Sequence, residues 1–417
     1  MTTRDSVKFF LGFAFSVLSI GARAIVVISG PEANIADLQP PASLPTNQEF
    51  GFSTAASNTA VVVTAPNQNG SFVSDIANVF SRDGTDTFSN VASIPQPDGQ
   101  PQGSLSSKFI TGNAVAIDGD ILAIGGPAAT IWPNTYQGEV DIYSRGDSGW
   151  YLSDILFDSG GLGDQLFGCA LALSGNTLIV GACNYDFLGG RAYVYAKSGD
   201  HWDVQALLTS TDHVSGQFFA YTAAIDGDTV VLGAPAATNL AGKVTGAAYV
   251  YVRSGTTWSD GVRLDITGED KDYFGGSVAA SGNTIVVGAP GKTVGTTASA
   301  GTTYLYKRSG STWTPTAELV SPTAGTAGAF GSSVAIVGKR LVVGEMQASA
   351  AHVFSEAGAT WSREASLYGT INSDFGASVS MSTSSPEFVV GAPFEDTGHA
   401  YVFESDRIFS DGFESVP

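Results

Sequence analysis

One stretch of the chain determines how the rest is interpreted: Phe274-Gly275-Gly276-Ser277-Val278-Ala279-Ala280-Ser281-Gly282-Asn283-Thr284-Ile285-Val286-Val287-Gly288-Ala289-Pro290. The same pattern recurs, with an opening residue that is usually Phe, a short turn and a closing Gly-Ala-Pro or a variant of it. Its other copies begin at Phe50, Thr111, Phe167, Phe219, Phe330 and Phe375, at intervals of 45 to 61 residues. Repetition at a period of a few tens of residues is the signature of a repeat architecture.

Each copy is expected to form four β-strands. Residues 277–280 and 284–287 flank a Ser-Gly-Asn turn, where Gly supplies the positive φ of a tight hairpin turn. Alternating aromatics at residues 304–306 predict a third strand, and a segment from Trp313 to Leu319 predicts a fourth. Four strands in each of seven copies predict an all-β fold, a seven-bladed β-propeller of four-stranded antiparallel blades.

The seventh copy lacks a fourth strand of its own. After residues 401–403 no Trp-led segment follows, whereas residues 35–38 precede the first copy much as residues 317–319 precede the sixth. We therefore expect an N-terminal strand to form the outer strand of the last blade and to close the ring. The predicted propeller covers residues 25–404, and residues 405–417 form a short C-terminal tail.

The first 24 residues have the features of a signal peptide. Arg4 and Lys8 give a basic start, residues 9–22 are apolar but short for a bilayer span, and Ala22-Arg23-Ala24 is a small-x-small cleavage signal. We expect cleavage after Ala24 and export to the periplasm, the cell surface or the medium. No later apolar stretch approaches the length of a membrane span.

Composition narrows the classes of function. Of 417 residues, 51 are Gly, 14% are charged and 43% are hydrophobic, which disfavours both a helix-rich protein and a disordered chain. The formal net charge is −20, and removal of residues 1–24 would leave 16 basic and 38 acidic side chains, a net charge of −22. Nucleic acids and anionic membrane surfaces require local positive charge, so neither is expected as a partner.

Seven copies of Phe-Gly followed by Gly-Ala-Pro resemble the FG-GAP repeat family, whose best-known member is the propeller of integrin α subunits. The resemblance extends over about residues 33–404 and implies a propeller fold with a non-enzymatic binding or adhesion role. Integrin-type repeats carry calcium loops between their first two strands, but here those slots hold short turns such as residues 174–176 and 281–283. Such turns cannot surround a cation that needs six or more oxygen ligands. The chain looks like the bacterial variant without calcium loops, and we expect no metal and no cofactor.

Motifs that suggest catalysis are weak. Gly146-Asp147-Ser148-Gly149 is similar to the nucleophile loop of trypsin-like proteases, and His352 lies in a segment similar to their histidine segment. Both occupy repeat positions that other copies fill with ordinary strand and turn residues. Arg145-Gly146-Asp147, a tripeptide that integrins bind, fills a turn slot that needs Gly. The four His include no zinc-spaced pair, and no spacing singles out a glycosidase-like pair of carboxylates.

Loop lengths favour one face of the disk as the binding face. The turns between first and second strands and between third and fourth strands are short, whereas the second-to-third loops and the connections between blades vary. A scaffold with one uniform and one variable face generally binds through the variable face. Aromatic and acidic side chains in these loops suit a glycan or a basic protein patch. The candidate binding residues are Trp132, Tyr136, Tyr185, Asp186, Phe187, Asp270, Asp272, Phe394, Glu395 and Asp396.

The chain has two cysteines, Cys169 and Cys183, near the same end of one predicted hairpin. In an oxidising compartment such a pair can form a disulfide. With a turn at Ser174-Gly175, however, Cys169 is expected to face Val180. A disulfide and two thiols are therefore both compatible with the sequence.

The leading hypothesis is an exported, monomeric propeller that binds a protein or a glycan through its long-loop face, without calcium and without catalysis. The first alternative is a propeller-type carbohydrate-active hydrolase or lyase with a carboxylate site near the central channel. The second is a structural surface protein without a discrete ligand.

Overall fold

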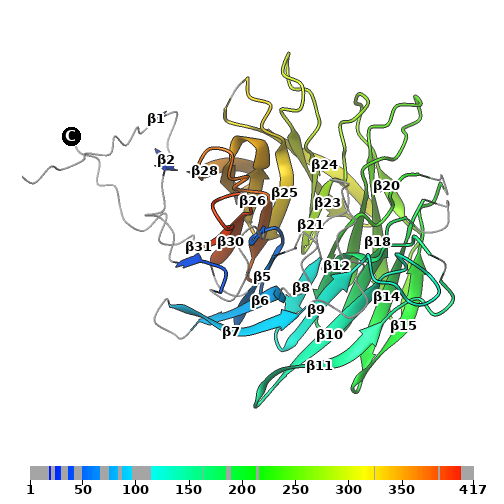
Figure 1. Cartoon of the computed structure of the whole chain (residues 1–417). Helices are drawn as coiled ribbons and strands as arrows, with labels where there is room; N and C mark the ends of the chain where they lie inside the picture. Colours follow the sequence, from blue (N-terminus) through cyan, green and yellow to red (C-terminus); the bar gives the residue numbers. More distant parts are fainter. Residues whose placement is uncertain are drawn as a thin grey trace, which may run out of the picture.

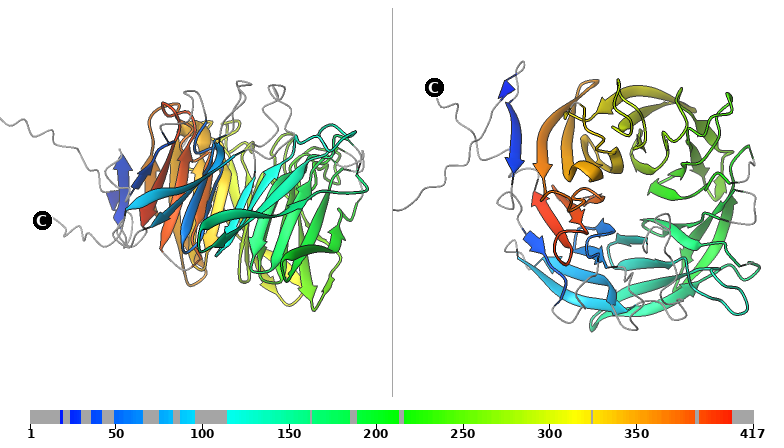
Figure 2. Two further views of the ribbon diagram at one scale, coloured as in Figure 1. Left: turned by 60° about the horizontal axis from the view of Figure 1, so that its bottom comes forward. Right: turned by 45° about the horizontal axis from the view of Figure 1, so that its top comes forward.

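The structure, a computed structural model, describes residues 18–19, 24–29, 36–41, 49–65, 75–82, 87–95, 114–161, 163–184, 189–212, 216–323, 325–383 and 386–404. Its strands form seven sheets that stand around a central axis as the blades of a propeller (Figures 1 and 2). The predicted ring of seven four-stranded antiparallel blades is confirmed. None of the described segments forms a helix with the length and apolarity needed to cross a membrane.

The first four blades follow one another along the chain. Blade one consists of β4 (Thr54–Ala56), β5 (Ala60–Thr64), β6 (Asp75–Arg82) and β7 (Phe88–Pro95). Blade two consists of β8 (Val115–Asp118), β9 (Ile121–Gly126), β10 (Glu139–Gly146) and β11 (Gly149–Leu156). Blade three consists of β12 (Phe167–Ser174), β13 (Thr177–Ala182), β14 (Arg191–Ser198) and β15 (His201–Leu208). Blade four consists of β16 (Thr222–Asp226), β17 (Thr229–Ala234), β18 (Ala247–Ser254) and a divided outer strand, β19 (Thr257–Trp258) with β20 (Val262–Leu264).

The last three blades complete the ring. Blade five consists of β21 (Ser277–Ser281), β22 (Thr284–Ala289), β23 (Thr302–Ser309) and β24 (Thr312–Val320). Blade six contains β25 (Phe330–Val337), β26 (Arg340–Glu345), β27 (Ala350–Ala357) and β28 (Thr360–Tyr368). Blade seven contains β29 (Ser378–Met381), β30 (Glu387–Ala392), β31 (His399–Glu404) and the N-terminal strand β3 (Ala36–Leu38).

The second strand of each blade is enclosed on both faces by neighbouring blades, and its sequence reflects this. Every residue of β22 is buried, so the strand is a continuous apolar run rather than an alternating one. The outer strand β24 has one face in solvent, and most of its residues are exposed or half-buried. The core therefore lies between blades.

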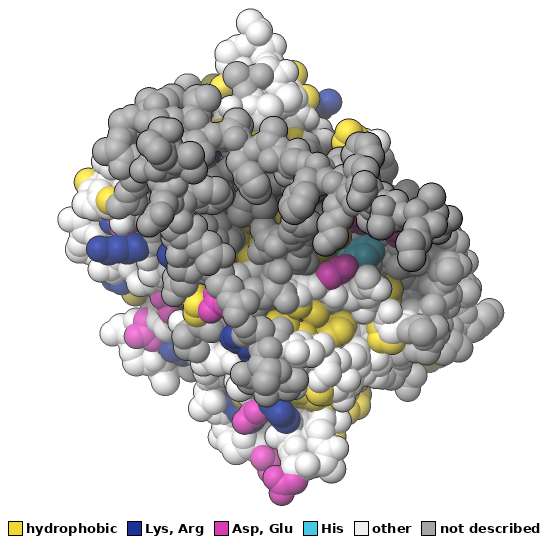
Figure 3. Space-filling model, turned by 90° about the vertical axis from the view of Figure 1, so that its left-hand side faces the viewer, with side chains coloured by type: hydrophobic (Ala, Val, Ile, Leu, Met, Phe, Trp, Pro, Cys, Tyr) yellow, Lys and Arg dark blue, Asp and Glu magenta, His cyan; other side chains and the backbone are white. Residues whose placement is uncertain are grey.

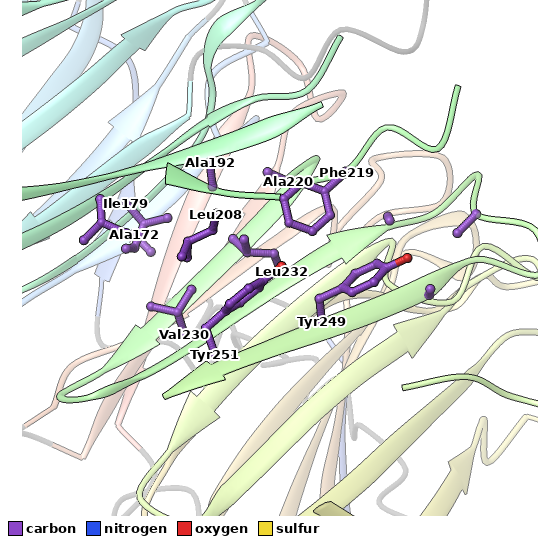
Figure 4. Packing of buried hydrophobic residues seen from close by; sticks show 14 residues of the cluster. Ala172, Ile179, Ala192, Leu208, Phe219, Ala220, Val230, Leu232, Tyr249 and Tyr251 are labelled. Atoms are coloured by element: carbon purple, nitrogen blue, oxygen red, sulfur yellow. The ribbon is translucent and has the colours of Figure 1, made fainter. Parts of the chain in front are cut away.

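The opening Phe of the six copies that begin with Phe anchors this core. Phe219 is fully buried and meets the Tyr249 ring edge-on, with 5.2 Å between ring centroids. Both side chains belong to blade four, and they share a cluster with Ile179 and Leu208 of blade three (Figure 4). The equivalent rings Phe167 and Tyr193, Phe274 and Tyr304, and Phe375 and Tyr401 lie 5.2, 5.5 and 5.8 Å apart.

Glycines allow the backbones of neighbouring blades to approach closely. A Cβ added to Gly288, the Gly of Gly-Ala-Pro in blade five, would lie 2.1 Å from the carbonyl oxygen of Gly331 in blade six. The same contact recurs between Gly233 and Gly275, Gly344 and Gly376, and Gly391 and Gly51, at 2.0, 2.1 and 1.9 Å. Any side chain at these positions would force the blades apart.

A hydroxyl group secures the same carbonyl oxygen. Ser277 Oγ of blade five donates to the Gly331 oxygen of blade six at 2.8 Å. Ser333 Oγ donates to Gly376 at 2.7 Å, and Ser378 Oγ donates to Gly51 at 2.9 Å across the junction of blades seven and one. Each buried carbonyl thereby keeps a hydrogen-bond partner at the point of closest approach.

Charged side chains also join blades. Arg82 of blade one pairs with Glu387 of blade seven, and Lys307 of blade five pairs with Glu356 of blade six. Figure 3 views one side of the ring, where Lys or Arg side chains lie next to Asp or Glu side chains. On the side shown, the coloured surface is therefore mixed in charge rather than uniformly acidic.

The N-terminal strand closes the ring as predicted. β3 pairs antiparallel with β31, and Leu38 is buried against the blade. His399 Nδ1 lies 2.8 Å from Asp37 Oδ1, and this hydrogen bond is the main cause of a raised pKa at His399. Protonated His399 therefore strengthens the junction, a contribution that is full below about pH 6.5 and is lost as the pH rises through the folded-state pKa.

A second N-terminal strand was not predicted. β2 (Ala24–Ser29) pairs in parallel with the outer edge of β28, and β1 (Leu18–Ser19) pairs with β2. Its contacts with β28 involve residues 26–29, which follow the expected cleavage point. The tail, residues 405–417, lies outside the described residues.

Deletion of residues 30–40 should sharply lower the melting temperature. It removes β3, exposes the edge of β31 and leaves a cavity where the Leu38 side chain is buried. A thermal melt of the exported chain measures the effect. Deletion of residues 25–29 is the matched control, since it removes only the added strand on blade six. A melting temperature unchanged by the first deletion would contradict ring closure by β3.

Substitution Gly288→Ala should lower the free energy of unfolding by about 1–3 kcal/mol, since the new methyl group would overlap the Gly331 backbone. Gly160→Ala, on a surface loop where the nearest neighbour of a Cβ is 3.8 Å away, should change it by less than about 0.5 kcal/mol. Denaturant unfolding of both variants tests the comparison. Equal effects would show that the close approach of blades is not what makes Gly288 necessary.

Candidate functional site

The two ends of the ring differ in their construction. We call the end that carries the second-to-third loops and the blade connections the loop face, and the end with the hairpin turns the turn face. On the loop face, the loops that the structure describes are tied to the connection that leads into the next blade. The amides of Leu166 and Phe167 donate to the carbonyls of Tyr136 and Gln137 at 3.0 and 2.9 Å. The loops are thereby held in place by backbone hydrogen bonds.

Residues with a left-handed backbone conformation shape these connections. The residue before the opening Phe has a φ between 52° and 58° in five copies: Leu166, Phe218, Tyr273, Ala329 and Asp374. This conformation costs a non-glycine residue about 1–2 kcal/mol, so the surrounding contacts must hold it. The fold therefore imposes the path of each connection.

Exposed apolar side chains are distributed unevenly between the two faces. Among the described residues, the large exposed hydrophobics outside the outer strands all lie on the loop face: Trp132, Phe157, Phe218, Leu240, Val244, Ile371 and Phe394. The described turns of the turn face contain none. Trp132, Leu240 and Ile371 are 88, 108 and 90% exposed. Concentrated exposed apolar side chains are typical of interaction surfaces.

Trp132 stands at the tip of a tight turn. The amide of Ile131 donates to the carbonyl of Asn134 at 3.1 Å, and the amide of Asn134 donates back at 2.8 Å. Asn134 Nδ2 also donates to Gln137 Oε1 and to the Gly161 carbonyl, at 3.0 and 3.1 Å. Tyr136, predicted beside Trp132, is half-buried with a φ of 54°, so its backbone shapes the loop.

Two of the predicted acidic residues serve their own loop. Asp272 is buried, accepts from the Glu269 amide at 3.0 Å and lies 3.4 Å from Lys292 Nζ. Asp270 Oδ1 accepts from the Val244 amide at 2.8 Å. Their carboxylates hold the connection between blades four and five to the neighbouring loop.

Blade seven brings a predicted and an unpredicted residue together. Phe394 is 53% exposed, and its amide donates to the carbonyl of Ser373 in the connection from blade six at 3.1 Å. Ile371 occupies the turn of that connection, which the Ser373 amide closes by donating to the Thr370 carbonyl at 3.2 Å. Glu395 is half-buried and Asp396 is exposed beside Phe394.

The structure does not describe all of the predicted residues. Tyr185, Asp186 and Phe187 lie outside the described residues. Trp132 belongs to blade two and Phe394 to blade seven, so the candidate residues are spread around the loop face. Sequence reasoning missed Leu240 and Ile371, because it selected aromatic and acidic residues and passed over exposed aliphatic ones.

The cysteines are two buried thiols and not a disulfide. The expected pairing of Cys169 with Val180 is wrong, since Leu171 pairs with Val180 and Cys169 falls in a β-bulge between Phe167 and Ala170. The bulge lets the Cys183 amide donate to Cys169 Sγ at 3.2 Å. Burial, reinforced by the contact with Cys183, raises the pKa of Cys169 well above its usual range, so the thiol stays protonated.

In the described part of the chain, no three His, Cys, Asp or Glu side chains are grouped as a metal ion would require. The slots of the calcium loops are tight turns, as at residues 175–176 between β12 and β13. The protease-like residues are also separated, since Ser148 lies in the β10–β11 turn of blade two and His352 in β27 of blade six.

The fold therefore defines the chain as a seven-bladed β-propeller with a variable loop face. The model of the FG-GAP repeat matches residues 150–195, 202–251 and 266–306. Three stretches of the chain thus match the FG-GAP repeat, as the resemblance of its sequence implied, and they lie within a seven-bladed propeller.

A solved structure from Bacteroides uniformis, described as a candidate 6-phosphogluconolactonase, is similar over 80% of this chain and 89% of its own, with a TM-score of 0.51. The two sequences are 11% identical, so the likeness concerns the fold alone. No curated protein sequence matches the chain.

Blade six departs from the repeat at three positions that contact one another. Glu345 replaces the Ala of Gly-Ala-Pro, His352 replaces the third-strand Tyr, and Ser366 lies opposite His352 on β28. His352 Nε2 lies 2.8 Å from Glu345 Oε2, and its Nδ1 lies 2.9 Å from Ser366 Oγ. His352 and Glu345 are completely buried and Ser366 is nearly so, which closes this Ser-His-Glu group to any substrate.

Burial lowers the pKa of His352, although the contact with Glu345 acts in the opposite direction. Because the folded-state pKa lies below the unfolded value, the folded protein favours the neutral ring. The stability that this contributes is present above about pH 6.5 and is lost as the pH falls below it.

Substitution His352→Ala should cost about 3–5 kcal/mol, since it leaves the Glu345 carboxylate buried without its partner. The double variant Glu345→Ala with His352→Tyr restores the side chains of blades three, four and five, Ala and Tyr. This double variant should be at least as stable as the wild type at pH 7. Near pH 5 it should be more stable than the wild type at the same pH, because it lacks the buried His352. Chemical denaturation at the two pH values measures both effects, and a double variant as unstable as His352→Ala would refute this account.

Proposed function

We propose that the protein is an exported binding protein that holds a protein or glycan ligand on its loop face and performs no chemistry on it. The observation that carries the proposal is the distribution of exposed apolar side chains, which are frequent on the loop face and missing from the described turns of the turn face. Loops tied by backbone hydrogen bonds present these side chains at little entropic cost.

The features of the N-terminal sequence support the location outside the cytoplasm. The basic start, apolar run and cleavage signal of residues 1–24 are those of a signal peptide. Closely joined blades give a rigid support for the loops, as a binding scaffold requires.

A ligand screen with surface variants tests the proposal. The exported chain would be immobilised and presented with glycan arrays, polysaccharides and proteins of the native envelope or medium. Trp132→Ala combined with Leu240→Ser should weaken retention of a bound ligand at least about tenfold, since exposed apolar anchors dominate binding. Asp147→Lys combined with Thr256→Lys, on the turn face, is the matched control and should leave retention unchanged.

The same screen separates binding from catalysis and from a passive structural role. Retained ligands would be analysed for release of cleaved products by chromatography and mass spectrometry. Product release that a single acidic substitution abolishes would overturn the proposal in favour of a hydrolase or lyase. Retention that loop-face variants never affect would overturn it in favour of a structural surface protein.

A further inference from the structure

The exposed apolar side chains of the loop face differ in their charged surroundings. Ile371 and Phe394 belong to two segments joined by the hydrogen bond from the Phe394 amide to the Ser373 carbonyl. Glu395 and Asp396 follow Phe394 directly. We call Ile371, Phe394, Glu395 and Asp396 the blade-seven patch. It combines two exposed apolar side chains with two carboxylates.

Several acids elsewhere on the loop face pair with bases. Asp212 and Asp265 both pair with Arg263, Asp272 pairs with Lys292, and Glu269 pairs with Lys243. Within the described part of the chain, neither Glu395 nor Asp396 pairs with Lys or Arg. Glu395 is half-buried and its carboxylate interacts with Tyr401, whereas Asp396 is exposed. Both carboxylates also contribute to the raised pKa of His399, which reports their negative potential.

From these contacts we infer that the blade-seven patch binds a cationic, amphipathic peptide segment of a partner protein. An apolar side chain of that segment would lie against Ile371 and Phe394, and Lys or Arg side chains would lie beside Glu395 and Asp396. The inference rests on the proposed function of the loop face and specifies its partner by chemical class.

The chemistry of the patch favours a peptide over the other ligands. A glycan is held by flat aromatic platforms, whereas Ile371 is aliphatic and 90% exposed. An anionic lipid surface would be repelled by the carboxylates and by the net charge of −20. Opposite charge at the rim of an apolar contact increases the association rate and selects the partner.

Fluorescence anisotropy with synthetic peptides tests this inference on the full exported chain. The probe is a fluorescein-labelled 12-residue peptide of alternating Lys and Leu with a central Phe. One control peptide has Glu in place of Lys, and the other has Ser in place of Leu and Phe. The wild type should bind the probe at least tenfold more tightly than either control, and added salt should weaken the binding.

Variants assign the binding to the patch. Ile371→Ser with Phe394→Ser should weaken binding of the probe at least tenfold. Glu395→Gln with Asp396→Asn should weaken it about threefold to tenfold and reduce its dependence on salt. The turn-face variant Asp147→Lys with Thr256→Lys should bind as the wild type does. Circular dichroism and melting temperatures verify that each variant is folded.

The outcomes distinguish this inference from the function on which it rests. Equal binding of the cationic and acidic peptides, or an Ile371→Ser, Phe394→Ser variant that binds as the wild type does, would overturn the inference. If Trp132→Ala with Leu240→Ser weakens a ligand while the blade-seven variants do not, the loop face binds and only the assigned patch is wrong. If loop-face variants have no effect on any ligand, both proposals fail.

Discussion

The fold depends on the close approach of two backbones, which the structure describes at six of the seven junctions between blades. The Gly of Gly-Ala-Pro in one blade faces the carbonyl of the Phe-Gly corner of the next, at a distance that excludes a Cβ. At four junctions a Ser or Thr hydroxyl of the first blade satisfies that carbonyl, as Thr222 does for Gly275 at 2.8 Å. The repeated residues are therefore needed for the contact between blades as much as for the strands within a blade.

This junction explains why the sequence predicts the fold so well. Gly is required where backbones approach, Phe fills the core between blades, and the turn residues allow tight hairpins. Because each blade needs all three, their recurrence reveals the number of blades. The missing fourth strand of the last copy likewise predicted the closure by β3, since an open sheet edge must be covered. Even Ala220, which replaces the corner Gly in blade four, keeps a positive φ of 63°, so the fold imposes the conformation on a residue that disfavours it.

The site was less predictable, because exposure depends on neighbours that one sequence does not reveal. Asp272 and Phe394 are both of residue types that often bind ligands. In the structure, however, Asp272 is buried within its own loop, whereas the Phe394 side chain is half exposed to solvent. The pairing of Cys169 failed for a related reason, since a β-bulge shifts the register without a marked change in sequence. The strand β2 on blade six has no counterpart in the repeat, so periodicity could not reveal it.

Blade seven takes its outer strand, β3, from before the first copy and its other three strands from the last copy. Consecutive blades elsewhere are linked by covalent connections, so the boundary of β3 with β31 is where the ring can open without breaking a bond. Three paired residues and the contact of Asp37 with His399 join β3 to β31. The pair of Arg82 with Glu387 and the hydrogen bond from Ser378 to Gly51 also hold blade one against blade seven. The loop that carries Phe394 leads directly into β31. A molecule bound there would therefore lie beside the one place where the ring is closed without a covalent connection.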